Sequence, residues 1–216
     1  MQHNINKMAS YIDELLDTAV SQRNKMDFPI ILVLEDKDDS ASSLIGRLFA
    51  SHYPSYYVST DGSDMDVAMQ VQAIPTHVEV AVIGLQNIAA INDTCQILQP
   101  THGISLLSEE RIIYMYKSLE KIRGLMFINN AHQALISESA MYFKKIFFAE
   151  SHELSTENLP IEVLFEANTV SFLNDKGERF DVKTMIENKA LILACVTLGR
   201  YFKIPIEKII AVIQNG

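Results

Sequence analysis

The chain has 216 residues, of which 48% are hydrophobic and 21% charged, and its formal net charge is −9. This composition excludes intrinsic disorder, and the acidic balance argues against a nucleic-acid surface, which needs clustered lysine and arginine. The longest apolar run, at 190–199, is shorter than the roughly 20 residues of a membrane-spanning helix. Because the first residues also lack the apolar core of a signal peptide, a cytoplasmic location is expected.

Helix and strand patterns alternate over most of the chain. Apolar spacing predicts an amphipathic helix at 4–22, whose apolar face contains Ile5, Met8, Ile12, Leu15, Leu16 and Ala19. Apolar runs predict strands at 29–34, 55–60, 78–84, 125–129 and 161–167. Further helices are expected directly after the first strand and at 63–73, 108–124 and 134–149, while 85–107 has a less regular pattern. The alternation predicts an α/β protein with a doubly wound, mostly parallel sheet of about five strands.

The C-terminal region has a different pattern. Two alternating runs predict a hairpin at 169–182, with a helix at about 183–201 and a short helix after Pro205. We therefore predict an α/β domain at 1–175 and a helical tail or reduced lid at 176–216. The sequence leaves open whether this tail packs on the sheet or is presented to a partner.

The loop after the first strand has the layout of a phosphate-binding P-loop, G-x-x-x-x-G-K-[ST], between a strand and a helix. Glu35 follows the strand, and Ser40, Ala41 and Ser42 occupy the end of the motif, where only Ser42 keeps its residue type. Residues 35–42 include four acidic residues and one lysine, a net charge of −3, which repels phosphate. We predict that this loop binds no nucleotide in the conventional way and that the protein has no cofactor. Two alternatives for the role of the loop are an ordinary solvated turn and a site for Mg²⁺ or Ca²⁺.

A second motif follows the strand at 125–129. Four apolar residues and then Asp-Glu-Ala-His form the Walker B motif of many ATPases, in which the Asp organises Mg²⁺ and the Glu activates water. Here amides replace both acids, and amides neither attract Mg²⁺ strongly nor accept a proton near neutral pH. An ordinary turn at the strand end is the alternative. We predict no catalytic residue and no metal ligand, and vestigial Walker positions at Glu35, Ser40, Ala41 and Ser42 and at Asn129, Asn130 and His132.

With these motifs, the chain resembles the AAA+ ATPases of the bacterial secretion type, in which a later strand carries a polar sensor residue; Asn168 is its nearest match. The resemblance extends over roughly residues 1–175 and implies a P-loop NTPase-like fold that has lost its ATPase residues. It implies a non-enzymatic interaction or scaffold protein for the assembly of a bacterial envelope structure, with a protein partner or a second copy of itself. The N-terminal amphipathic helix and the C-terminal tail are the expected contact elements.

Two alternatives stay open. The first strand with Glu35 and Asp36 also resembles the start of a response-regulator receiver, in which Gly84 would stand at the phosphorylated aspartate. Such a receiver would be inactive. The other alternative is an ATPase or nucleotide sensor with atypical residues, which nucleotide binding would reveal.

Overall fold

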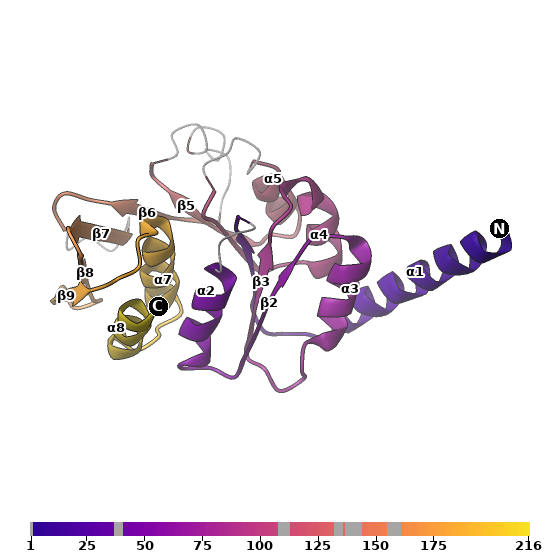
Figure 1. Cartoon of the computed structure of the whole chain (residues 1–216), viewed down its shortest axis with the longest axis horizontal. Helices are drawn as coiled ribbons and strands as arrows, with labels where there is room; N and C mark the ends of the chain where they lie inside the picture. The colour runs from indigo at the N-terminus through magenta and orange to yellow at the C-terminus, as the bar shows by residue number, and fades with distance from the viewer. Residues whose placement is uncertain (1, 37–40, 108–112, 132–135, 137–143, 155–160) are drawn as a thin grey trace.

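The computed structural model describes residues 2–36, 41–107, 113–131, 136, 144–154 and 161–216. Its central element is a nine-stranded sheet with the order β2-β3-β1-β4-β5-β6-β7-β8-β9 (Figure 1). The strands are β1 (Ile30–Leu34), β2 (Ser55–Thr60), β3 (Val80–Leu85), β4 (His102–Ser105), β5 (Leu125–Asn129), β6 (Lys145–Glu150), β7 (Ile161–Glu166), β8 (Thr169–Leu173) and β9 (Arg179–Lys183). Strands β1 to β7 pair in parallel, whereas β8 and β9 are antiparallel. The predicted α/β class with a mostly parallel sheet is confirmed, with nine strands in place of about five.

Two strands differ from the sequence prediction. β4 lies in the stretch without a regular pattern, and its four residues are too few to establish a period. β6 was predicted as the end of a helix, but it pairs with both β5 and β7. Its apolar residues cluster without a clear alternation, so tertiary pairing rather than local preference determines its conformation.

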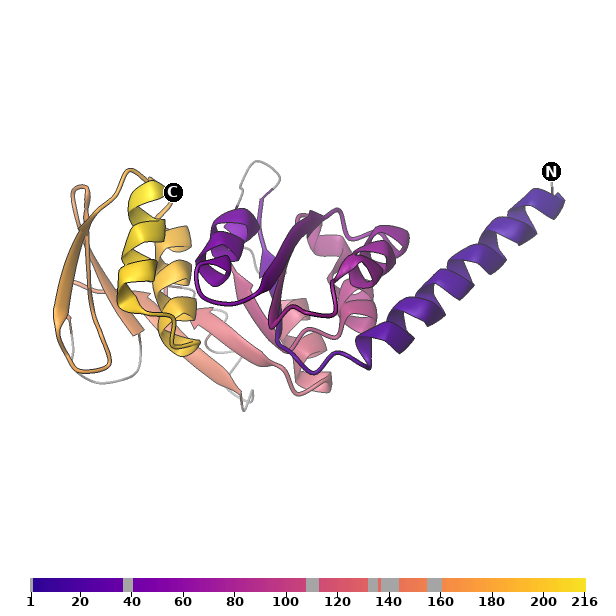
Figure 2. The same ribbon diagram turned by 90° about the horizontal axis from the view of Figure 1, so that it is seen from below.

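Helices cover both faces of the sheet (Figures 1 and 2). One face is covered by α1 (Gln2–Arg23), α3 (Asp64–Ala73), η1 (Ile88–Ala90), α4 (Ile91–Leu98) and α5 (Ile113–Lys121). The other face is covered by α2 (Ala41–Ala50), α7 (Lys189–Tyr201) and α8 (Ile206–Asn215). All five residues of β1 are buried, alternately in the two cores, as a continuous apolar run predicts.

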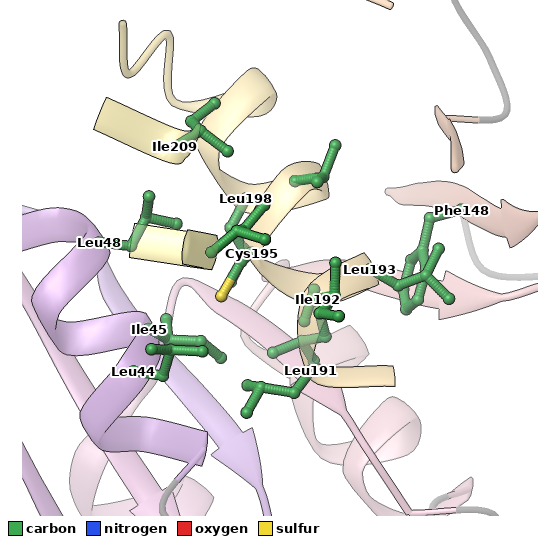
Figure 3. Close-up of a cluster of buried hydrophobic side chains, with 14 of the residues drawn as sticks. Leu44, Ile45, Leu48, Phe148, Leu191, Ile192, Leu193, Cys195, Leu198 and Ile209 are labelled. Atoms are coloured by element: carbon green, nitrogen blue, oxygen red, sulfur yellow. The ribbon is translucent and has the colours of Figure 1, made fainter. Parts of the chain in front are cut away.

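The C-terminal helices belong to the core on one face of the sheet. Figure 3 shows α7 side chains, Cys195 among them, directed toward Ile45 and its neighbours on α2. Gly199 permits the close approach of α8, because a Cβ atom there would lie 2.6 Å from Ile209. The helical tail therefore packs on the sheet. The division into 1–175 and 176–216 stays a prediction; its boundary falls in the turn between the paired strands β8 and β9.

Helix α1 is anchored to the protein by its last turn. The buried Arg23 guanidinium donates to the carbonyl oxygens of Leu98 (2.7 Å), Met26 (3.0 Å) and Gln99 (2.8 Å). It thereby caps the C-terminus of α4, where unpaired carbonyl groups favour a cation. Across the residues that the structure describes, no helix combines the length and the apolarity needed to cross a bilayer.

Candidate functional site

The two predicted motifs lie at the same edge of the sheet. In doubly wound sheets, ligands bind outside the carboxyl ends of the strands, where the strand order reverses. Here that point lies between β1 and β4. The strands β2 and β3, which follow β1 in the chain, lie on one side of β1 in the sheet, and β4 lies on its other side. Glu35, Ala41 and Ser42 follow β1, and Asn129 ends β5, so parallel pairing brings both motifs to this edge.

Glu35 is the central charged residue of this edge, and its side chain is fully buried. Its Oε2 atom accepts a hydrogen bond from the backbone N–H of Ser42 at 2.6 Å. Its Oε1 atom accepts from the hydroxyl groups of Ser42 at 2.9 Å and Ser59 at 2.7 Å. The two hydroxyl oxygens lie 2.9 Å apart. The carboxylate therefore joins the end of β1 to α2 and β2.

The position of this carboxylate resembles that of a bound anion. Ser42 lies in the first turn of α2, where unpaired N–H groups and the helix dipole favour negative charge. In a P-loop this end of the helix faces phosphate. Here the backbone N–H of Ser42 is already bonded to a carboxylate of the chain itself.

Gly84 in β3 provides the space for Glu35. A Cβ atom at Gly84 would lie 2.1 Å from Glu35 Oε1 and 2.6 Å from Ser42 Oγ, distances far below van der Waals contact. A side chain at this position is therefore incompatible with the observed arrangement. That includes the aspartate that a receiver would carry there.

The remaining predicted positions have plain structural surroundings. Ala41 is fully buried in the core and supplies no cation. Asn129 accepts a hydrogen bond from the backbone N–H of Ala131 at 2.9 Å, which stabilises the turn after β5. The backbone N–H of Asn130 donates to the carbonyl oxygen of Phe148 at 2.9 Å. Ser40 and His132 lie outside the described residues, and Asn168 lies in the turn between β7 and β8.

A P-loop hydroxyl residue such as Ser42 ordinarily binds Mg²⁺ together with nucleotide phosphates. The oxygen atoms of Glu35 and Ser42 have the right chemistry, but they bond to each other and both residues are almost fully buried. Because Mg²⁺ keeps several water molecules, this pair does not fit a hydrated ion. Elsewhere in the described part of the chain, no three His, Cys, Asp or Glu residues gather as a metal site would require.

Two residues of this arrangement were absent from the predicted site. Ser59 comes from β2 and meets Glu35 only because β3 places β2 beside β1 in the sheet. Gly84 was considered only as a receiver position. A glycine inside a buried strand often marks the close approach of another group, and that pattern could have identified it.

Comparison with solved structures finds folds similar to this one in several ligases. No protein-family model matches the chain, and no curated protein matches it in sequence. The solved structure of MurF from Acinetobacter baumannii matches with a TM-score of 0.69 at 16% identity, over 94% of this chain and 49% of MurF. A pseudomurein peptide ligase type C from Methanothermus fervidus matches with a TM-score of 0.68 at 11% identity, over 90% of this chain and 50% of the ligase. MurF ligase from Thermotoga maritima, solved in complex with ADP, matches with a TM-score of 0.66 at 13% identity, over 93% and 52%.

These similarities correct the functional prediction. The chain was expected to be a non-catalytic interaction or scaffold protein and not an enzyme, whereas the structures that it resembles are those of ligases. The prediction assumed that a chain without the usual P-loop residues cannot be catalytic. Catalysis depends on all the residues of a site, and the P-loop supplies only some of them. At this level of identity, similarity establishes the fold. The chain spans about half the length of these ligases and has the P-loop-type α/β fold that they contain.

Proposed function

We propose that this chain is the nucleotide-binding unit of an ATP-dependent ligase. The observation that carries the proposal is the similarity of nearly the whole chain, 94% of it, to MurF. Two further structures support an adenine nucleotide as the ligand: a MurF ligase with ADP, and a complex of FPGS with AMPPCP and folate, which matches with a TM-score of 0.51 at 12% identity. The ligand site is the carboxyl edge of the sheet beside β1 and β4, since this is where doubly wound folds bind ligands.

This proposal replaces the secretion-type AAA+ assignment with a ligase assignment. The general relation to P-loop ATPase folds is common to both. The structures that support the ligase assignment match over 90% or more of this chain. The AAA+ resemblance extended only over roughly residues 1–175 and depended on motifs whose charged residues are absent.

The atypical loop determines how strongly a nucleotide is held. Ala41 provides no ammonium group for the phosphates, and Glu35 already occupies the backbone N–H of Ser42. A hydrogen bond to a charged group contributes about 1.5–3 kcal/mol, so the missing lysine alone lowers affinity by roughly 10- to 150-fold. We therefore expect nucleotide binding that is weaker than that of an ordinary P-loop protein.

A ligase also needs a site for the molecules that it joins. Because the chain spans about half the length of the matched ligases, we propose that a further unit, in the same polypeptide or a partner, supplies that site. A cytoplasmic location belongs to the same proposal. Its support is that both cysteines are buried as free thiols, as expected in a reducing compartment.

The test is calorimetric titration of the chain with ADP and with AMPPCP, each with and without Mg²⁺. We expect saturable binding. In the titrations without Mg²⁺ we expect Asn130→Glu to weaken it, because no metal ion then offsets the negative charge that this variant adds at the carboxyl edge. Asn24→Glu makes the same chemical change on an exposed residue just after α1 and should leave binding unchanged. Absence of binding at millimolar nucleotide refutes the proposed function. Equal weakening by both variants refutes the proposed location.

A further inference from the structure

A pocket of about 640 Å³ lies at the amino edge of the sheet, where β4 and β5 begin. Because these strands run parallel to β1, this edge is opposite the carboxyl edge with Glu35 and the proposed nucleotide site. The volume is within the range of about 300–1,000 Å³ that is typical of small-molecule sites. Pro100, Ile122 and Tyr201 give part of its lining an apolar character.

Three cationic side chains line this pocket, those of Arg23, Arg123 and Lys144. No described residue of the lining is acidic, although the whole chain has 27 acidic and 18 basic residues. Within the described part of the chain, none of the three cations forms an ion pair. Burial and, to a smaller extent, Lys144 lower the pKa of His102 in the lining to about 4, so this imidazole adds no charge at pH 7. The pocket therefore contains three positive charges that no carboxylate of its described lining offsets.

Two of these cations also have contacts that stabilise the fold. Arg23 caps the C-terminus of α4, and the ammonium group of Lys144 donates to the carbonyl oxygen of Arg123 at 3.0 Å. Since an ammonium group has three N–H donors, two of those of Lys144 are left for a ligand. The side chain of Arg123 is exposed and makes no hydrogen bond to any described residue. Contacts within the described chain therefore do not account for Arg123.

Arg123 also adopts a backbone conformation that favours glycine. Its φ angle is 57°, and its N–H group and that of Gly124 donate to the carbonyl oxygens of Glu120 and Leu119. These bonds form a Schellman turn after α5, in which the left-handed residue is most often glycine because a Cβ atom is strained there. An arginine at this position thus costs stability, which points to a use for its side chain.

Lys203 offers a comparison within the same molecule. It follows α7 with a φ angle of 58°, and its ammonium group forms an ion pair with Asp175 at 2.6 Å. A counter-charge inside the protein therefore accounts for that cation. Arg123 has the same backbone conformation and no such counter-charge among the described residues.

We propose that this pocket binds a small organic anion, whose phosphate or carboxylate group pairs with Arg123 and Lys144. A guanidinium group forms two parallel hydrogen bonds with either kind of oxyanion, and the ammonium group of Lys144 adds further donors. The apolar part of the lining suits the carbon skeleton of such a molecule. The site is separate from the proposed nucleotide site and does not depend on the proposed function.

The test is an NMR titration of the full chain with citrate and with inorganic pyrophosphate, without Mg²⁺, at pH 7.5 and at an ionic strength kept constant with chloride. The imidazole signals of His102 report on this pocket, and their absence in His102→Asn assigns them. We expect these signals to shift saturably. Tighter binding of citrate identifies a carboxylate ligand, and tighter binding of pyrophosphate identifies a phosphate ligand.

Arg123→Gly should raise the dissociation constant at least about tenfold, since it removes a hydrogen bond between charged groups. It should leave the thermal unfolding midpoint unchanged or higher, because glycine relieves the backbone strain. Lys144→Gln should also raise the dissociation constant, since it removes a positive charge. Lys203→Gly is the matched control: it removes a cation from the same backbone conformation outside the pocket, and it should leave binding unchanged.

Asn130→Glu separates this site from the proposed nucleotide site. Asn130 follows the carboxyl end of β5, whereas the pocket lies at the start of that strand, so the variant should not change the binding of either anion here. Absence of saturable shifts with both anions overturns the proposal. Unchanged binding in Arg123→Gly and Lys144→Gln, or equal weakening by Lys203→Gly, also overturns it. A lower unfolding midpoint in Arg123→Gly would overturn it too, because the arginine would then have a structural role.

Discussion

Replacing Glu35 with alanine tests whether the buried carboxylate stabilises the strand–helix junction. The change removes the acceptor of the backbone N–H of Ser42, and it removes one of the hydroxyl contacts of Ser42 and of Ser59. The two hydroxyl groups can still bond to each other, since their oxygens lie 2.9 Å apart. The buried N–H of Ser42 is then the main group left without a partner.

The magnitude follows from two contributions. An unsatisfied buried donor costs about 1–3 kcal/mol. Loss of negative charge at a helix N-terminus costs about 0.3–1 kcal/mol at an exposed site and up to about 2 kcal/mol at a buried one. We therefore expect Glu35→Ala to lower the free energy of unfolding by about 2–4 kcal/mol.

Glu35→Gln separates the two contributions, because it keeps one acceptor oxygen for the N–H of Ser42 and loses the charge. Its amide group can donate to the serine hydroxyls, which can turn to accept. We expect a loss of about half that of alanine, measured by urea unfolding at neutral pH. Glu187→Ala, at an exposed position, should change the free energy of unfolding by less than about 0.5 kcal/mol.

The opposing effect is the desolvation of a buried charge, which can exceed the gain from its contacts. If desolvation dominates, Glu35→Ala stabilises the protein. An alanine variant that is as stable as the wild type, or more stable, therefore refutes the assignment of Glu35 as a stabilising anion at the start of α2.

Two further predictions concern Gly84 and His102. Gly84→Ala should destabilise the protein by about 1–3 kcal/mol in urea unfolding, because its Cβ would lie 2.1 Å from Glu35 Oε1. In the double variant with Glu35→Ala, the loss of stability should be smaller than the sum of the two single losses. A loss equal to that sum would contradict the close approach of Gly84 and Glu35. Burial, with a smaller effect of Lys144, lowers the pKa of His102 to about 4, whereas an unfolded histidine has a pKa near 6.5. The neutral side chain of His102 therefore contributes about 3 kcal/mol to the free energy of unfolding above pH 6.5, and this contribution is lost as the pH falls toward 4. His102→Asn should make the free energy of unfolding depend less on pH in this window. If the wild type and the variant depend on pH with equal slopes, the lowered pKa of His102 is contradicted.

The sequence by itself determined the class of the fold. The continuous apolar runs of β1, β3 and β5 can be buried on both faces only in a parallel sheet covered by helices, and these strands lie where they were predicted. The hairpin of β8 and β9 and the helix α1 also follow from local patterns. In each of these elements, hydrophobic period and turn chemistry indicate the same conformation.

Other parts of the molecule depended on tertiary contacts. Residues 145–150 form the strand β6 because two neighbouring strands pair with them. α7 is part of the core because α2, α8 and the sheet surround it. The local sequence of a segment does not show which distant segments will lie beside it. Local patterns therefore could not predict the strand conformation of β6 or the burial of α7.

The candidate site shows the same division. The sequence identified Glu35 and Ser42 as the ends of an altered phosphate loop, and it established that the loop carries negative charge. Only the fold brought Ser59 and Gly84 to the same carboxylate, through the order of β2, β3 and β1 in the sheet. Residue types set the chemistry that is available at the site. Strand order set which groups meet there, because hydrogen bonds between strands depend on long-range pairing.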